Sequence, residues 1–232
     1  TTVVATALAG SALVSADFSR GATVGETAIR GERVTVSGGE PAPSANYRVT
    51  IVIDWGPSTH PATLPPAAHV SQPVLVNHSE RGDLFRVGTL ATSGIEFMAE
   101  QGGTATLSAE QRADPTVDEV RIAAGINGPG QRSFTLAVDR TNRFVSIVTM
   151  LAPSPDWFLG IDSLELFADG VWTPRIEVPL GAYDSGTDNG PRFLSANSDT
   201  NPAQPISGPR DSGFTAAAAE GNFGRLIVER LP

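Results

Sequence analysis

Cysteine is absent from this sequence of 232 residues. Its absence excludes disulfide bonds, thiolate zinc sites and cysteine nucleophiles, although it leaves the cellular compartment open. The sequence also lacks any run of about 18 apolar residues, so we expect no transmembrane helix. Three catalytic signatures are missing as well: the Gly-x-Ser-x-Gly elbow of serine hydrolases, the HExxH zinc motif and the P-loop. These absences argue against several large classes of enzyme.

Positive charge is scarce. The 16 basic residues are outnumbered by 25 acidic ones, which gives a formal net charge of -9. Nucleic-acid binding needs clustered Lys and Arg to contact phosphates, and here the basic residues are scattered, so we expect no nucleic-acid partner. An acidic surface instead suits divalent cations.

The composition favours a β protein with a real core. Hydrophobic residues make up 40% and charged residues 18%, which is enough apolar material to exclude wholesale disorder. Gly 24 and Pro 18 are high for a helical protein and are typical of many strands joined by turns. The length suits one large all-β domain, alone or with an arm.

Period-two alternation predicts most of the elements. The expected strands are residues 47–55, 117–124, 132–139, 143–151, 163–167, 172–180 and 222–231. We interpret 132–139 and 143–151 as a hairpin, and Asp169-Gly170 as a hairpin turn. A helix is expected at 93–101, with a capping box of Ser93 and Glu96 and a stop at Gly102, and a second short one at 108–113.

These elements predict an all-β fold, an antiparallel β-sandwich with a short helical insertion, over residues 46–232. Residues 1–45 form a separate N-terminal β extension in this interpretation. They contain strand-like stretches at 2–18 and 26–37, then a Gly- and Pro-rich linker. The first 16 residues also have the composition of a signal peptide's apolar region, but we favour an ordered strand or arm. The extension either pairs with the domain's own sheet or is an assembly arm for a neighbouring subunit.

Two acidic clusters flank a strand pattern in residues 150–188. Asp156 lies in Pro-Ser-Pro-Asp-Trp just past an expected strand end, while Asp184 and Asp188 lie around Gly186 in Tyr-Asp-Ser-Gly-Thr-Asp. Three carboxylates that converge at one end of a sandwich repel each other unless a cation neutralises them. Oxygen ligands on turns suit Ca2+. The alternative is that these residues are ordinary Asx-turn residues that cap loops.

The same stretch resembles the spondin N-terminal domain of the F-spondin and mindin type. Residues 148–190 carry the PSPDW motif, a Leu-Gly-x-Asp-Ser-Leu segment, a Trp on the next strand and a YDSGTDNG turn. Weaker similarity extends over residues 46–232. The resemblance implies a C2-like antiparallel β-sandwich with a calcium site in its loops. It also implies a secreted protein with a non-catalytic role at the cell surface or in the extracellular matrix, where its partner is a protein or a glycan.

Carried over residue by residue, the resemblance assigns Asp156, Asp184 and Asp188 as Ca2+ ligands. Mindin-like members carry a further glutamate on a strand upstream of PSPDW, and that position corresponds to Ala137 here. Asp139 lies two residues further on, on the same strand face, and is a weak substitute. The resemblance therefore implies a site that lacks one carboxylate.

Other motifs point less clearly to function. Arg81-Gly82-Asp83 matches an integrin-binding tripeptide, which we interpret as coincidence, and Asn77-His78-Ser79 matches a glycosylation sequon. We expect His78 to be a buried, hydrogen-bonded histidine. His60 and His69 lack the further ligands of a zinc site, and the aromatic residues Trp157, Phe158 and Trp172 are expected to pack in the core.

The sequence thus supports one main hypothesis and two alternatives. The main hypothesis is an exported, calcium-binding, spondin-like domain that acts in adhesion or surface assembly and is not an enzyme. The first alternative is a subunit of a surface filament or layer that polymerises through residues 1–20. The second is a carbohydrate-active enzyme that uses Asp156 and Asp184 as its carboxylate pair, which calcium binding would prevent.

Overall fold

The computed structural model of this chain describes residues 40–82 and 84–232, of which Glu40–Pro232 belong to one unit. The strands expected at 2–18 and 26–37 and the assembly arm expected at 1–20 lie outside the described residues. The division at residue 45 therefore stays a prediction. Within the described residues, no helix is long and apolar enough to cross a membrane.

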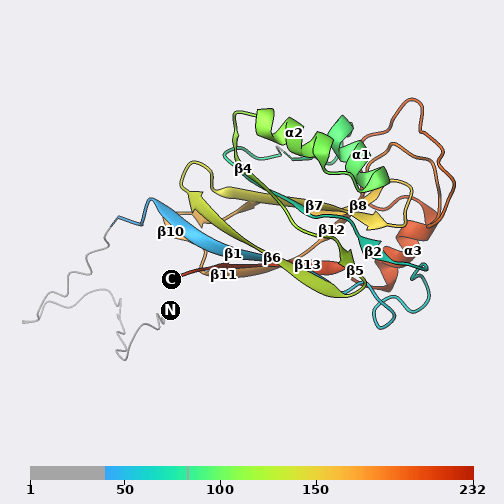
Figure 1. Cartoon of the computed structure of the whole chain (residues 1–232), viewed down its shortest axis with the longest axis horizontal. Helices are drawn as coiled ribbons and strands as arrows, with labels where there is room; N and C mark the ends of the chain where they lie inside the picture. Colours follow the sequence, from blue (N-terminus) through green and yellow to red (C-terminus); the bar gives the residue numbers. More distant parts are fainter. Residues whose placement is uncertain (1–39, 83) are drawn as a thin grey trace, which may run out of the picture. The chain divides into compact units, whose positions relative to one another are not determined.

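The described residues form two large facing antiparallel sheets, as the sequence predicted, and one small two-stranded sheet. Sheet I has the strand order β11-β13-β1-β6 in the described part of the chain (Figure 1). Its strands are β1 (Ser44–Ile53), β6 (Gly130–Asp139), β11 (Arg175–Pro179) and β13 (Gly224–Arg230). In β1 the side chains of Tyr47, Val49 and Ile51 are completely buried, because alternate residues of a strand point to the same face. Antiparallel β13 pairs along β1, with Tyr47 opposite Arg230.

Sheet II has the order β12-β8-β7-β2-β5, and β3 joins it by pairing with both β7 and β4. Its strands are β2 (His69–Val70), β3 (Val74–His78), β4 (Val117–Ile122), β5 (Ile126–Asn127), β7 (Phe144–Ala152), β8 (Trp157–Glu165) and β12 (Gly181–Asp184). All nine residues of β7 are buried. Both faces of β7 are covered, since sheet I packs on one side and α1 (Ser93–Gln101) and α2 (Ala105–Ala113) lie on the other (Figure 1).

The hydrophobic core accordingly has two layers. Between the sheets, Tyr47, Trp157 and Leu226 belong to one cluster of buried side chains. Between sheet II and the helices, Met98 and Phe158 belong to a second cluster. Adjacent residues of β8 thus serve different layers, which is the consequence of the strand's period of two. The sequence prediction that these aromatic residues pack in the core is confirmed.

Helix α1 matches its expected bounds, although its cap differs by one residue. Thr92 is the N-cap, and its side chain accepts a hydrogen bond from the amide of Ile95. Thr92 has the extended backbone that an N-cap needs, whereas Ser93 is already helical. Gly102 ends the helix with φ 68, as predicted. A third helix, α3 (Ser212–Glu220), was not predicted in the polar, Pro-rich passage after residue 188.

Two predicted strand arrangements were wrong. β6 and β7 do not form a hairpin, because β6 pairs with β1 in sheet I and β7 lies in sheet II. The chain crosses between the sheets at a turn in which Asp139 accepts hydrogen bonds from the amides of Thr141 and Asn142 at 2.8 and 2.7 Å. The expected strand 172–180 is divided into β10 (Val171–Trp172) and β11, since Pro174 between them lacks an amide donor. The predicted turn at Asp169-Gly170 does join β9 (Phe167–Ala168) to β10.

Candidate metal centre

Asp156 lies in the loop that joins β7 to β8 and is completely buried. Its Oδ2 accepts hydrogen bonds from the Thr187 amide at 2.8 Å, the Asp188 amide at 3.2 Å and the Ser185 hydroxyl at 3.0 Å. These donors all belong to the loop after β12, so this single carboxylate oxygen fastens two loops together. Its other oxygen, Oδ1, has no hydrogen-bond partner among the described residues.

Asp184 is the last residue of β12, opposite Trp157 at the start of β8. This pairing brings the two acidic clusters to the same end of sheet II, as the sequence predicted. Asp184 is completely buried, and its Oδ1 accepts hydrogen bonds from the Gly186 amide at 2.9 Å and from the Arg210 guanidinium. Its Oδ2, like Oδ1 of Asp156, receives no hydrogen bond within the described part of the chain.

Asp188 completes the set from the same loop and is 3% exposed. Its Oδ1 accepts a hydrogen bond from the Gly190 amide at 2.6 Å, and its Oδ2 from the Ser198 amide at 2.8 Å. The bend before it depends on Gly186, whose φ is 82 and whose place leaves no room for a side chain: a Cβ there would lie 2.1 Å from the carbonyl oxygen of Gln204. The backbone of this loop therefore requires glycine.

The electrostatics of the cluster are unfavourable without a counter-ion. Burial, reinforced by the negative charge of Asp156, raises the pKa of Asp184 to about 7, although the Arg210 guanidinium opposes the shift. Burial also raises the pKa of Asp156, against the hydrogen bonds that its carboxylate accepts. Keeping these carboxylates ionised at neutral pH costs free energy that a bound cation would recover.

Two observations bear on whether the residues fit a metal ion. Oδ1 of Asp156 and Oδ2 of Asp184 are buried acceptors without a donor in the described part of the chain, and such atoms are rare in folded proteins. Hard, oxygen-only acceptors of this kind are the ligands that Ca2+ takes. However, no group of three or more His, Cys, Asp or Glu side chains among the described residues is already arranged to hold a metal. The donor set thus has the right chemistry for Ca2+, while its carboxylates do not form a closed cage.

Glu100 is a fourth carboxylate at this site that the sequence prediction missed. It lies in the last turn of α1 and is partly buried. Burial raises its pKa, as do the charges of Asp156 and Asp188, and a hydrogen bond from the Thr187 side chain lowers it. The sequence carried a signal for this residue: an acidic side chain at a helix C-terminus is disfavoured by the helix dipole, and α1 has no basic residue there.

The position expected to carry the fourth carboxylate, Ala137, lies elsewhere. Because β6 runs antiparallel to β1, Ala137 lies opposite Asn46 near the start of β1, about 23 Å along the strand from Gly130. The carboxylate loops lie near the Gly130 end. The nearby substitute, Asp139, caps the turn between β6 and β7. Asp139 is therefore engaged in that turn, and it does not replace the carboxylate that the resemblance finds missing at Ala137.

The other sequence candidates have structural roles. His78 is completely buried, and its Nε2 lies 2.7 Å from the Ser146 hydroxyl, which confirms the expected hydrogen-bonded histidine. Asn77 is also completely buried, and its side chain donates hydrogen bonds to the carbonyls of Asn142 and Phe144. The sequon is therefore closed to glycosylation in the folded domain.

The remaining histidines and Arg81 of the Arg-Gly-Asp tripeptide have the following contacts among the described residues. His60 is buried and stacks on Phe223, with ring centroids 4.8 Å apart. His69 lies 2.8 Å from the Ala67 carbonyl through its Nδ1. Arg81 pairs with Glu165 on the surface, and residue 83 lies outside the described residues. These contacts describe the surroundings of His69 and Arg81, while the buried Nε2 of His60 has no hydrogen-bond partner among the described residues.

Comparison with known proteins agrees with this fold and these motifs. The chain is 32% identical over 194 residues to Spondin-2 of Rattus norvegicus, which covers 80% of this chain and 57% of that protein. It is 31% identical over 211 residues to Spondin-1 of Rattus norvegicus, a match that covers 81% of this chain and 25% of that protein. It is 33% identical over 170 residues to Spondin-2 of Homo sapiens, and this match covers 70% of this chain and 51% of that protein. The chain thus spans about half of the Spondin-2 proteins and a quarter of Spondin-1.

The Spondin_N family model matches residues 45–216. This range contains nearly all of β1, the helical insertion and both carboxylate loops but ends before β13, so the match covers most of the sandwich together with the candidate centre. The resemblance inferred from PSPDW and YDSGTDNG is therefore confirmed, and the chain belongs to the Spondin_N family of spondin N-terminal domains.

Proposed function

We propose that this spondin domain binds Ca2+ through Asp156, Asp184 and Asp188, and that it acts outside the cell as a non-catalytic adhesion or surface-assembly module. The observation that carries the calcium proposal is the pair of buried carboxylate oxygens, one on Asp156 and one on Asp184, without a hydrogen-bond donor among the described residues. Glu100 supplies further negative charge beside them.

Each residue of the centre has a separate task. Oδ2 of Asp156 holds the loop after β12 through Ser185, Thr187 and Asp188, so Oδ1 stays free for an ion. Arg210 and the Gly186 amide hold Oδ1 of Asp184 and leave Oδ2 free in the same way. Bound Ca2+ would neutralise the converging carboxylates and so stabilise the arrangement of the two loops.

The extracellular, non-catalytic part of the proposal rests on family membership. The relatives are spondins, and the carboxylates that could serve as acid and base in glycoside hydrolysis are the proposed calcium ligands. A protein or glycan at the cell surface remains the expected partner. Assembly of a filament through residues 1–20 stays a prediction; deleting these residues should abolish polymerisation and leave a folded monomer.

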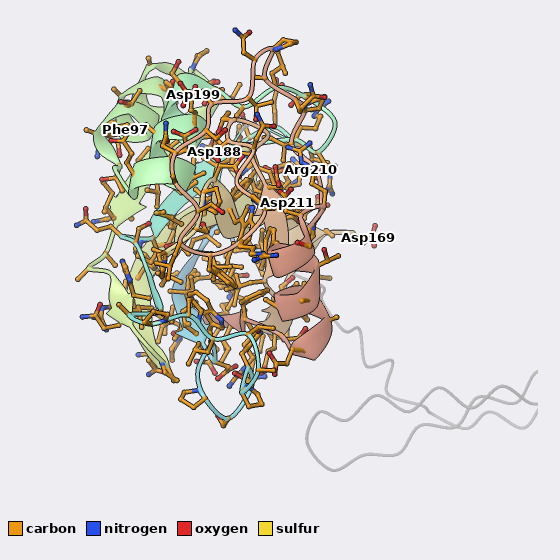
Figure 2. All side chains as sticks on the ribbon, turned by 90° about the vertical axis from the view of Figure 1, so that its right-hand side faces the viewer. Phe97, Asp169, Asp188, Asp199, Arg210 and Asp211 are labelled. Carbon is orange, nitrogen blue, oxygen red and sulfur yellow. The ribbon has the colours of Figure 1, made fainter. Side chains whose placement is uncertain are left out.

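Thermal melting with EDTA and with Ca2+ tests the calcium proposal. At a free Ca2+ concentration 100 times Kd, binding to the folded state adds about 2.7 kcal/mol, so we expect Tm to rise by about 5–10 °C. Asp184→Asn should remove this rise. Asp169→Asn is the matched control, because Asp169 is an exposed aspartate in the β9–β10 turn, away from the group formed by Asp188, Arg210 and Asp211 (Figure 2). Identical melting of the unsubstituted protein in EDTA and in Ca2+ would sink the proposal.

A further inference from the structure

β6 is an edge strand of sheet I. It pairs with β1 on one side, and among the described residues no strand pairs with its other side. Its register with β1 runs without a shift from Ser44 opposite Asp139 to Ile53 opposite Gly130, so β6 contains no bulge. A regular strand of this length presents a row of backbone donors and acceptors, which is a template for pairing with another strand.

The hydrogen bonds between β1 and β6 show which backbone groups of β6 point outward. The Arg140 amide donates to the Pro43 carbonyl at 3.3 Å, which continues the register of the two strands by one residue. Hydrogen-bonded pairs alternate along antiparallel strands, so the even-numbered residues of β6 bond to β1. The hydroxyls of Thr50 and Ser133 lie 2.9 Å apart, which agrees with the closer side chains of a pair without backbone hydrogen bonds. The odd-numbered residues of β6 therefore direct their amides and carbonyls away from the sheet.

The other edges of the two large sheets carry features that oppose strand addition. β4 and β11 have charged residues along them, β11 ends in Pro179, and β12 and β5 have only four and two residues. Charge, proline and short length are the means by which proteins protect an edge. Residues 133–138 of β6, Ser-Phe-Thr-Leu-Ala-Val, contain neither charge nor proline. The exposed side chains of Ser133, Thr135 and Ala137 are small, so they leave this edge accessible.

We propose that two copies of this domain associate through β6, which pairs antiparallel with the β6 of its partner about a twofold axis at Thr135. A twofold interface requires one surface to be complementary to itself. In this register Ser133 lies opposite the partner's Ala137, and Gln131 lies opposite the partner's Asp139, so an amide faces a carboxylate. Each of these positions is odd-numbered, and the outward-facing backbone groups of one strand therefore meet those of the other.

The side chains of β6 distinguish this register from its neighbour. With the axis at Thr135, Arg132 lies opposite the partner's Val138. An axis displaced by one residue to Leu136 would place Arg132 opposite the partner's Arg140, and like charges directly opposite each other destabilise a sheet. Residues that lie opposite each other point to the same face, so the two four-stranded sheets would form one continuous sheet with their buried faces on the same side.

This association differs from the functions proposed above in two respects. It needs no calcium, because β6 carries none of the proposed ligands. A twofold interface is also closed, so it yields a dimer and not a filament. One pair of strands is a small interface of the kind found in transient complexes, and we therefore expect a dimer Kd above about 1 µM.

Sedimentation equilibrium of the full chain in EDTA, at concentrations above and below Kd, tests the dimer. Thr135→Lys places two positive charges at the axis and should raise the dimer Kd at least about tenfold. Thr106→Lys is the matched control, because Thr106 is exposed on α2, and it should leave Kd within about twofold of the unsubstituted value. Circular dichroism should show the same fold in both variants, since each alters an exposed side chain.

Single cysteines test the register, because the chain has no cysteine of its own. In the proposed dimer the two Cα atoms of residue 135 lie about 5.5 Å apart, within the reach of a disulfide, so Thr135→Cys should form a linked dimer on oxidation. Ala137→Cys is the control. Its two Cα atoms lie four residues apart along the paired strands, about 13 Å, and should not link.

Three results would each overturn the inference. One is a chain that stays monomeric at about 1 mM, far above the Kd expected of even a transient complex. Another is a dimer whose Kd is the same for Thr135→Lys and Thr106→Lys. The third is oxidation that links Ala137→Cys as readily as Thr135→Cys. Because these measurements are made in EDTA, a failure of the calcium proposal would leave them unchanged.

Discussion

Arg210 offers a way to measure the charge balance of the centre without touching a carboxylate. Its guanidinium pairs with Asp184, whose side chain is completely buried, while its own side chain is 35% exposed. Among the described residues, it is the cation that contacts this carboxylate. Arg210→Gln keeps a side chain with a hydrogen-bond donor but removes the charge, so we expect it to destabilise the metal-free protein.

The size of the loss follows from the geometry. Removing one partner of a fully buried ion pair costs about 3–5 kcal/mol, because the other charge is left unpaired. Here the arginine is partly in water and the Gly186 amide still donates to the same oxygen. We therefore expect Arg210→Gln to lower the free energy of unfolding by about 1–3 kcal/mol in EDTA. With saturating Ca2+ the ion neutralises Asp184, and the loss should fall to about 1 kcal/mol or less.

Urea denaturation of both proteins, in EDTA and in Ca2+, measures these quantities. Arg175→Gln is the control, because Arg175 pairs with Glu177 and Glu229 on the surface with 53% of its side chain exposed. Arg175→Gln should change the free energy of unfolding by no more than about 0.5 kcal/mol, both in EDTA and in Ca2+. Equal losses for Arg210→Gln with and without Ca2+ would show that Arg210 and the ion do not share Asp184, and this reasoning would then be refuted.

Two further substitutions test the loop and the helix that frame the centre. Gly186→Ala places a Cβ against the Gln204 carbonyl at positive φ, so we expect urea denaturation to show a free energy of unfolding about 2–4 kcal/mol lower. Gly208 has open space around it, so Gly208→Ala should leave the free energy of unfolding nearly unchanged. Equal effects of the two substitutions would contradict the steric argument. Phe214→Ala removes a completely buried ring from Trp157 and should cost about 3–5 kcal/mol. Val171→Ala, 64% exposed, is its control, and a similar loss there would show that burial does not set the cost.

The sequence predicted that the three aspartates of the candidate centre lie close together, because their motifs follow strand ends. β12 pairs with β8, so Asp184 lies opposite Trp157 and next to the loop of Asp156. Glu100 lies 56 residues before Asp156 on a helix, and spacing along the chain could not bring it there. It became visible only once α1 was seen packed on sheet II beside the carboxylate loops.

Strand alternation predicted which faces are buried but not which strands pair. β6 and β7 were expected to be a hairpin because a short turn separates them, yet a short turn also connects two facing sheets. Helix α3 had a signal that the Pro-rich surroundings obscured. Its four consecutive alanines, residues 216–219, have the highest intrinsic helix propensity, and Asp211 is a favoured N-cap residue.

The pairing of β1 with β13 has a consequence for how the domain can be joined to others. Tyr47 lies opposite Arg230, and the Leu231 amide donates to the Asn46 carbonyl at 2.7 Å, so the start of β1 and the end of β13, the first and last strands of the described chain, lie side by side. The carboxylate loops beside Trp157 lie at the opposite pole. In a multidomain chain, both flanking polypeptides would attach at the end of the domain where β1 begins and β13 ends. The acidic loops at the other end would then lie away from both attachment points.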